Sequence, residues 1–249
     1  MSSMNEIRGG LVTLHFGKRV AWDYPPELAH LFSGFISRFR DPRPPDRFLA
    51  VGIRDQEDSF EIENSSCFFR EVPSELDFIN VLSYWTRRML AKELASALVI
   101  HASAVQARQG AILMMGPKGS GKSTLAKALC DEGYAFLAED GAPVGLDDGV
   151  VFPSMPMSFL PENVAMPTKL FRIISIRYVP GSRTALQGMK GPAAALELLR
   201  ENFNLRATGG RGLAFIARIS ERGLFSLTFP DKSEGLRVVR EIAELETVP

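Results

Sequence analysis

Hydrophobic residues recur along this chain with two different periods, and the change between them falls near residue 73. Before it, alternating apolar and polar residues predict strands at LVTLHF, FLAVGI and SFEIEN, while PELAHLFSGFISRF is typical of a helix. From Pro73 to about Leu98 apolar residues recur at helical spacing, with Ser74 in the N-cap position. We therefore predict a β-rich N-terminal section with a long linking helix over residues 1–97.

Residues 98–249 alternate between strand and helix patterns. Strands are expected at ALVIHASAV and AILMMG, joined by the turn ARQG; a helix then begins at Lys122 and ends at Gly133, before the strand YAFLAED. This order predicts a βαβ unit with a parallel sheet and an α/β fold class. The tail predicts, in chain order, the strand FRIISIRYV, helices at PAAALELLRENF and near LAFIARI, the strand LFSLTF and a closing helix at GLRVVREIAEL.

Composition narrows the classes of partner. With 249 residues, 45% of them hydrophobic, the chain can bury one substantial core. Its 29 basic residues equal its 29 acidic ones, so the net charge does not indicate binding to nucleic acid or anionic lipid. Two cysteines suit a reducing compartment, and neither a signal-peptide pattern nor a membrane-spanning apolar run is evident. We expect a cytoplasmic protein with no nucleic-acid or membrane partner.

The strongest motif is GPKGSGKS, which begins at Gly116 and fits the phosphate-binding pattern G-x-x-x-x-G-K-[ST]. Glycines let successive backbone N–H groups point at phosphate oxygens, and the following helix presents its positive end. Lys122 supplies a cation near the β and γ phosphates, and Ser123 offers a hydroxyl to Mg²⁺. The predicted nucleotide-binding residues are Gly116, Pro117, Lys118, Gly119, Ser120, Gly121, Lys122, Ser123 and Thr124.

Two adjacent carboxylates, Glu139 and Asp140, end the strand that follows this helix. If that strand lies beside the phosphate-loop strand, its carboxyl end emerges at the same edge of the sheet as the phosphates. Adjacent side chains on a strand point to opposite faces, so the two carboxylates can serve separate tasks. We assign Asp140, with Ser123, to Mg²⁺ and Glu139 to general-base catalysis; an acidic, solvated turn is the alternative.

His101 is placed by the register of a hairpin. If ARQG closes a two-residue hairpin, Ala107 pairs with Gly110, and counting outward sets His101 opposite Gly116. His101 would then lie beside the γ-phosphate site and could orient a phosphate, a water or the base. A core histidine with satisfied hydrogen bonds is the alternative. We treat His15 and His30 as structural residues.

Together, the segments HASAV, GPKGSGKST and AFLAED resemble the C-terminal catalytic domain of HPr kinase/phosphorylase and its shorter relatives. The tail from LELLRENFNL onward resembles the ending of short relatives encoded with peptide-modification systems, including lasso-peptide precursor kinases. The resemblance covers residues 98 to about 245 and implies a P-loop α/β core related to phosphoenolpyruvate carboxykinase. The first 97 residues do not resemble the N-terminal domain of the full-length enzyme.

The resemblance implies ATP- and Mg²⁺-dependent phosphorylation of a serine hydroxyl on a protein or peptide. It gives Lys122 and Ser123 the phosphate and metal roles and places His101 in the active site. It also sets the catalytic aspartate of the family at Glu139 and the neighbouring acid at Asp140. Glu139 departs from that pattern, and its longer side chain leaves open whether Glu139 or Asp140 is the base.

Two loops could complete the site. Residues 179–191 combine glycines with Arg183 and Lys190, as a mobile cover over a phosphoryl group would require; an ordinary exposed loop is the alternative. Residues 154–167 are rich in methionine and proline and could contact a peptide, although core packing explains them equally well. Arg172 and Arg177 point to opposite faces of a predicted strand, so at most one of them would face the nucleotide.

The sequence therefore predicts a serine kinase for a protein or peptide substrate. A P-loop ATPase, nucleotide-dependent switch or assembly factor, and a small-molecule kinase, remain as alternatives. The acceptor, the preference for ATP over GTP and the oligomeric state, including a homo-oligomer, stay open.

Overall fold

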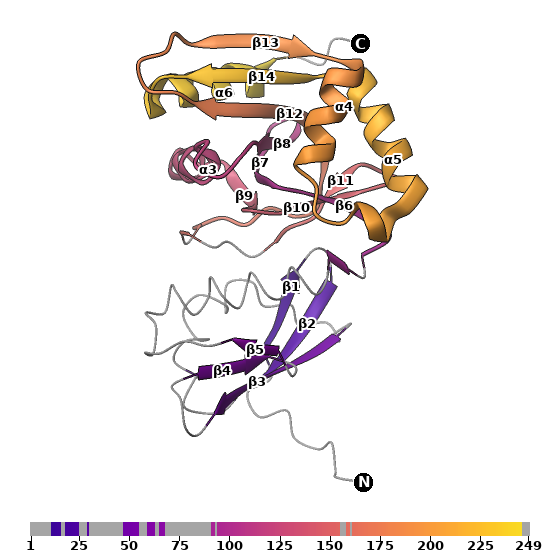
Figure 1. Ribbon diagram of the computed structural model, residues 1–249. Helices are drawn as coiled ribbons and strands as arrows, with labels where there is room; N and C mark the ends of the chain where they lie inside the picture. The colour runs from indigo at the N-terminus through magenta and orange to yellow at the C-terminus, as the bar shows by residue number, and fades with distance from the viewer. Residues whose placement is uncertain are drawn as a thin grey trace. The chain divides into compact units, whose positions relative to one another are not determined.

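The computed structural model describes residues 11–15, 18–24, 29, 47–54, 59–62, 65–67, 91–92, 94–154, 158–159 and 161–245. The protein has a mixed α/β structure (Figure 1). It divides into two compact units, Met1–Arg87 and Arg88–Pro249. The predicted domain boundary after residue 97 stays a prediction.

The first unit contains a five-stranded sheet whose strands follow one another in chain order. Among the strands described in this unit, β2 and β3 pair in parallel and the other neighbours are antiparallel. The predicted strand FLAVGI falls within β3, and the described residues of the predicted strands LVTLHF and SFEIEN form β1 and β4. The predicted helix at residues 26–39, with His30, lies outside the described residues apart from position 29. The strands are β1 (Leu11–His15), β2 (Lys18–Asp23), β3 (Arg47–Arg54), β4 (Ser59–Ile62) and β5 (Ser65–Cys67).

The end of the predicted linking helix was wrong. Residues 68–90 lie outside the described part of the chain, and the two residues at 91–92 are helical. Strand β6 (Ala97–Ile100) begins before the predicted end at Leu98, and all four of its residues are buried. A short, fully buried strand lacks the alternation of apolar and polar residues that distinguishes a strand from a helix. The predicted helix was therefore extended into residues that form β6.

The second unit is built on a nine-stranded sheet with the order β6-β10-β11-β12-β8-β7-β9, to which β14 and then β13 are added beside β12. The remaining strands are β7 (Ala102–Ala107), β8 (Gly110–Met115), β9 (Ala135–Ala138), β10 (Ala142–Gly145), β11 (Val150–Val151), β12 (Thr168–Tyr178), β13 (Ala185–Met189) and β14 (Leu224–Phe229). The helices are α3 (Lys122–Asp131), α4 (Gly191–Arg200), α5 (Leu205–Arg222) and α6 (Lys232–Glu244).

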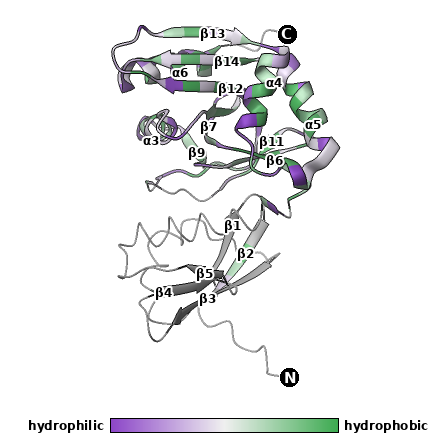
Figure 2. Cartoon of the chain, viewed as in Figure 1, coloured by the Kyte–Doolittle hydropathy of each residue, from purple (hydrophilic) through white to green (hydrophobic). Residues whose placement is uncertain are grey.

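Helices cover the sheet of this unit on both sides (Figure 1). Helix α3 contacts β7, β8, β9 and α6, whereas α4 packs on α5, which contacts β6. Helices α4 and α5 carry both hydrophobic and hydrophilic residues (Figure 2), as expected for helices with one buried face. Their buried side chains, including Leu198, Phe215 and Ile219, join the core formed by strand residues such as Leu113 and Leu137.

The predicted hairpin register is confirmed, since Ala107 pairs with Gly110 and Ala102 with Met115. Two strand predictions need correction. The single strand predicted at ALVIHASAV is interrupted by a bend at His101, which separates β6 from β7. The strand at YAFLAED does not pair with β8; β7 lies between β8 and β9 and is antiparallel to both. Strands β8 and β9 are therefore parallel, and their carboxyl ends share one edge.

The two bends in these strands lie side by side. Strand β7 pairs with β9 through Ala104 and Ala138, and β6 pairs with β10 through Ile100 and Ala142. In both pairs the residue numbers sum to 242, so one antiparallel register continues through the bends at residues 101 and 139–141. Between them, the Gly141 N–H donates to the carbonyl of Ala102 at 3.1 Å. This pairing sets His101 against the acidic pair.

A corner between α4 and α5, residues 201–204, holds the first bend in place. Asn204 is 4% exposed. Its side-chain oxygen accepts from the Val99 N–H at 2.8 Å, and its amide donates to the carbonyls of Leu94 and Ala97 at 2.9 Å each. The Phe203 N–H donates to the Val99 carbonyl at 2.9 Å. Because this corner satisfies backbone groups of β6, it fixes the strand that leads into His101.

Replacing Asn204 by Ala should lower the free energy of unfolding by about 2–4 kcal/mol, because it leaves buried backbone groups without partners. Urea unfolding followed by circular dichroism measures the change. The matched control is Asn163→Ala, at an exposed position, with an expected change below about 0.5 kcal/mol. Equal stability of the two variants would contradict the role given to Asn204.

Candidate functional site

The loop of residues 116–121 joins β8 to α3 and depends on glycine at both ends. Gly116 has φ +147°, and a Cβ there would lie 2.6 Å from the carbonyl oxygen of Ile176 in β12. Gly121, the N-cap of α3, has φ +97°, and a Cβ there would lie 3.1 Å from the ring of Phe229 in β14. Both positions favour glycine because of backbone conformation and close neighbours.

The loop has the properties of an anion cradle. Within the described residues, no side chain caps the N-terminus of α3, and its first turn contains no acidic residue. The Ser120 side-chain oxygen is buried and has no hydrogen-bond partner among the residues that the structure describes. The Ser120 N–H donates to the Pro117 carbonyl at 3.1 Å, which closes the loop. A phosphate fits this site, since its oxygens would accept from both the helix end and the Ser120 hydroxyl.

Lys122 places a buried cation at the same point. Lys122 is 7% exposed, and its Nζ donates to the carbonyls of Gly116 at 2.6 Å and Pro117 at 3.1 Å. Burial lowers the Lys122 pKa from its ordinary value of 10.5, while the charges of Asp140 and Glu201 act to raise it. The carboxylates of Asp140 and Glu201 are thus close enough to interact electrostatically with the Lys122 side chain.

The two predicted acids have different surroundings. Glu139 is 1% exposed, and its carboxylate accepts from the N–H of Ser158 at 2.9 Å and from the Ser158 hydroxyl. Asp140 is half-exposed and has a left-handed backbone with φ +54°. Its Oδ1 lies 2.9 Å from Nε2 of His101. Of the two acids, Asp140 is the one bonded to His101, and the general-base role of Glu139 stays a prediction.

His101 lies between two carboxylates. Besides the contact with Asp140, its Nδ1 lies 2.8 Å from Oε2 of Glu201, and its backbone N–H donates to the Glu201 carbonyl at 2.5 Å. The ring centroid of Phe203 lies 5.1 Å from that of His101. Sequence reasoning missed Glu201, because nothing in RENFN indicates that the end of α4 returns to a bend a hundred residues earlier in the chain.

The other predicted site residues have varied positions. Ser123 is half-buried and Thr124 exposed in the first turn of α3, while Pro117, Lys118 and Gly119 form the exposed part of the loop. Of the two arginines in β12, Arg172 pairs with Ile112 in the middle of β8. Arg177 is exposed and lies beyond the pair formed by Ser175 and Met115, at the edge that carries the loop.

The prediction of one loop over residues 179–191 needs correction. Its second half is β13, which pairs antiparallel with β14. Arg183 precedes this strand and Lys190 follows it, so the two charges lie beyond opposite ends of β13, which is itself roughly 17 Å long. They cannot both contact one phosphoryl group. The turn residues flanking TALQGM concealed a short edge strand.

The described residues of the segment 154–167 form backbone hydrogen bonds with β9. The Ser154 N–H donates to the Leu137 carbonyl at 2.8 Å, and Phe136 exchanges backbone hydrogen bonds with Asn163 and Ala165. Residues 155–157 and 160 lie outside the described part of the chain. Met166 is 77% exposed, and the proposed peptide contact stays a prediction.

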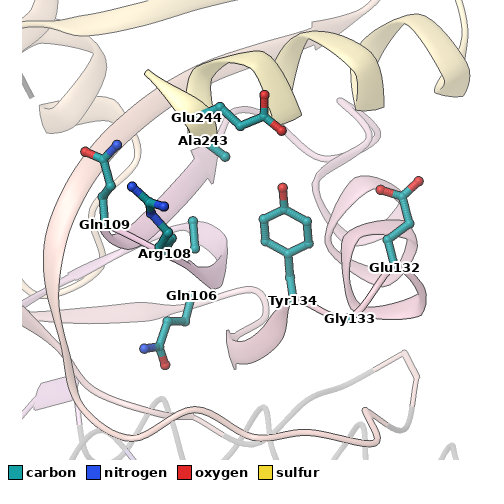
Figure 3. A pocket seen from close by; sticks show the side chains of 9 residues that line it. Gln106, Arg108, Gln109, Glu132, Gly133, Tyr134, Ala243 and Glu244 are labelled. Atoms are coloured by element: carbon teal, nitrogen blue, oxygen red, sulfur yellow. The ribbon is translucent and has the colours of Figure 1, made fainter. Parts of the chain in front are cut away.

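A cavity of about 530 Å³ opens at the opposite end of the same strands (Figure 3). It lies among the β7–β8 turn with Arg108 and Gln109, the end of α3 with Glu132 and Tyr134, and the end of α6 with Glu244. Burial, followed by the charges of Glu244 and Glu132, raises the Tyr134 pKa. Because β8 spans the distance between this cavity and Gly116, the two sites are roughly 17 Å or more apart.

No group of three or more metal-ligating side chains is found among the described residues. A magnesium ion held by phosphates needs fewer, because it takes one or two protein ligands and keeps several waters. The Ser123 hydroxyl and the Asp140 carboxylate are ligands of that kind. Among the described helices, none is long and apolar enough to span a bilayer.

No family model and no curated protein matches the chain. Among solved structures, it is weakly similar to the Hpr(Ser) kinase/phosphatase from Coxiella burnetii, with a TM-score of 0.31 and 14% sequence identity. The similarity covers 58% of this chain and 96% of that chain. This similarity is too low to establish a family.

The lowered pKa of Lys122 predicts a pH dependence of stability in the absence of nucleotide. Between the lowered pKa of Lys122 in the folded chain and the value of 10.5 in the unfolded chain, the unfolded chain binds more protons at this position. The free energy of unfolding therefore rises with pH in this range. We expect the stability of the wild type relative to Lys122→Met to increase as pH approaches 10.5. Urea unfolding at several pH values measures this, and a constant difference would contradict it. Lys127→Met removes an exposed lysine from the same helix and is the control.

Proposed function

We propose that this protein is a kinase that binds ATP with Mg²⁺ at the loop of residues 116–121 and transfers the γ-phosphate to a hydroxyl group of a protein or peptide. The observation that carries the proposal is the convergence of three groups at one sheet edge: the buried Lys122, Asp140, and His101 bonded to Asp140. Phosphoryl transfer requires mainly charge stabilisation and positioning, and these groups supply both.

The loop and Lys122 would bind the nucleotide phosphates. The end of α3 and the Ser120 hydroxyl offer hydrogen-bond donors, and the ammonium group of Lys122 is already held beside the loop by two carbonyls. A cation in a poorly solvated position interacts more strongly with charge that develops on a transferred phosphoryl group than an exposed one would. Arg177, exposed at the same edge, is a further candidate for such a contact.

Ser123 and Asp140 would hold the magnesium ion, Asp140 directly or through a water. The metal would supply neutralisation of phosphate charge. Asp140 is half-exposed on a backbone turned into the left-handed region, and it interacts with the Lys122 charge. These properties favour Asp140 over the buried Glu139 as the magnesium ligand, because that residue must be accessible to both the phosphate loop and the substrate.

Proton transfer follows from the same placement. The acceptor oxygen forms a bond to the γ-phosphorus, the bond from that phosphorus to ADP breaks, and the hydroxyl proton passes to a carboxylate. We assign this proton to Asp140, which would then contact the magnesium ion through a water, and whose orientation is fixed by Nε2 of His101 at 2.9 Å. Glu139, with both Ser158 hydrogen bonds to its carboxylate, would hold the segment around residue 158 against β9.

The acceptor class depends on the sequence resemblance. A serine in a protein or peptide is the proposed acceptor, and a ribosomal peptide precursor, such as a lasso-peptide precursor, is the first candidate to test. A small-molecule acceptor, or hydrolysis of ATP by a switch protein, would give different products in the same assay.

The direct test is incubation of the full chain with labelled ATP, Mg²⁺ and peptides encoded beside its gene. We expect label on serine, detected by mass spectrometry, and a loss of at least about a hundredfold in Asp140→Asn with ATP binding retained. Asp147→Asn, which removes an exposed acid paired with Arg211, is the control. Label found only as free phosphate would contradict the kinase proposal.

Glu139→Gln distinguishes the two assignments of the base. If Glu139 is the base, transfer disappears while ATP binding and stability persist. We expect the reverse, with transfer kept within about tenfold and a lower melting temperature, because the substitution weakens the buried hydrogen bonds to Ser158. Thermal unfolding and the transfer assay, performed on the same preparation, decide between them.

A further inference from the structure

We propose that Glu201 is a positioning residue for His101, fixing the orientation of the imidazole and the proton on its Nδ1. The catalytic consequence rests on the proposed kinase function, whereas the effect on the histidine ring does not. Glu201 follows α4, far in sequence from the phosphate loop and the acidic pair.

The contacts define one orientation of the ring. Nδ1 faces Oε2 of Glu201 at 2.8 Å and Nε2 faces Oδ1 of Asp140 at 2.9 Å. An ionised carboxylate only accepts hydrogen bonds, so Glu201 favours the form of the ring in which Nδ1 carries a proton and donates it. A flipped ring would set carbon atoms against both carboxylates. Glu201 therefore determines which edge of the ring faces Asp140.

Backbone hydrogen bonds hold Glu201 in place. Its N–H donates to the Glu197 carbonyl at 3.2 Å, and its carbonyl accepts from the His101 N–H at 2.5 Å. The next residue, Asn202, forms an isolated antiparallel β-bridge with Ile100. The Asn204 side chain then bonds backbone groups of β6 on the other side of the corner. The carboxylate thus extends from a segment anchored on both sides of Glu201, which is the arrangement expected of a residue that orients another.

The surroundings of His101 make this carboxylate difficult to replace. The side chains that face the ring from neighbouring elements are Asp140 before β10, Glu201 after α4, and Phe203, whose ring packs against it. Both carboxylates also interact with the Lys122 charge. The Glu201 and His101 side chains are only 13% and 19% exposed, so water competes weakly for the contact.

Glu201→Gln is the informative change, because glutamine keeps the size of the side chain but offers either an amide oxygen or an NH₂ group to Nδ1. The Nδ1 proton is then no longer required. The matched control is Glu197→Gln, one turn earlier on α4, whose carboxylate contacts Arg200 and Ser175 rather than His101.

The first measurement is ¹⁵N NMR of the full chain with labelled histidine, with the His101 signals assigned from a His101→Gln sample. We expect Nδ1 to carry a proton in the wild type and in Glu197→Gln, and the pattern of the two ring nitrogens to change in Glu201→Gln. The second measurement is phosphoryl transfer. We expect kcat to fall about 10- to 100-fold in Glu201→Gln while KM for ATP stays within about twofold.

The outcomes separate the two proposals. Unchanged histidine signals in Glu201→Gln overturn the positioning role, whatever happens to kcat. Changed signals with an unchanged kcat also overturn it as a role in the reaction. Changed signals in a protein whose wild type transfers no phosphate support Glu201 as the residue that orients His101 and contradict the kinase function. If Glu201→Gln does not fold, Glu201→Asp keeps the charge, and we expect it to retain the Nδ1 proton with a smaller loss of kcat.

Discussion

Antiparallel pairing carried through two bends is the constraint on which the candidate site depends. One register extends from the Ile100–Ala142 pair to the Ala104–Ala138 pair, on both sides of the two bends, and it shifts only beyond Ala104. Because the strands are hydrogen-bonded before and after the bends, the bends must occur at the same level. The left-handed backbone of Asp140 and the Gly141 hydrogen bond to Ala102 make the second bend. As a result, a histidine and a carboxylate distant in sequence come within hydrogen-bond distance.

The rest of the site is assembled around this paired bend. Strand β7 begins directly after His101 and lies between β8 and β9, so it brings the carboxyl ends of these two parallel strands to one edge. The phosphate loop begins where β8 ends, and Lys122 turns its buried ammonium group back onto that loop. From the other side, the corner after α4 adds Glu201 and locks β6 through Asn204. The site is thus formed by rigid strand ends, as electrostatic catalysis requires.

Local signals in the sequence were sufficient for elements whose determinants are local. The Arg108–Gln109 turn predicted the register of the β7–β8 hairpin, and apart from β13 the tail elements from β12 to α6 follow the predicted order. Elements set by tertiary contacts escaped prediction. The bend at His101 and the separation of β8 from β9 depend on strand order, β13 depends on pairing with β14, and Glu201 becomes a site residue only through the α4–α5 corner. Periodicity does not encode such long-range contacts.

The most direct measurement of the central claim is a crystal structure of the full chain with Mg²⁺ and a non-hydrolysable ATP analogue. The account predicts the β and γ phosphates against the loop of residues 116–121, with a magnesium ion about 2.1 Å from the Ser123 hydroxyl and in direct or single-water contact with Asp140. Phosphates bound elsewhere, or a metal ion separated from Asp140 by more than one water, would contradict it.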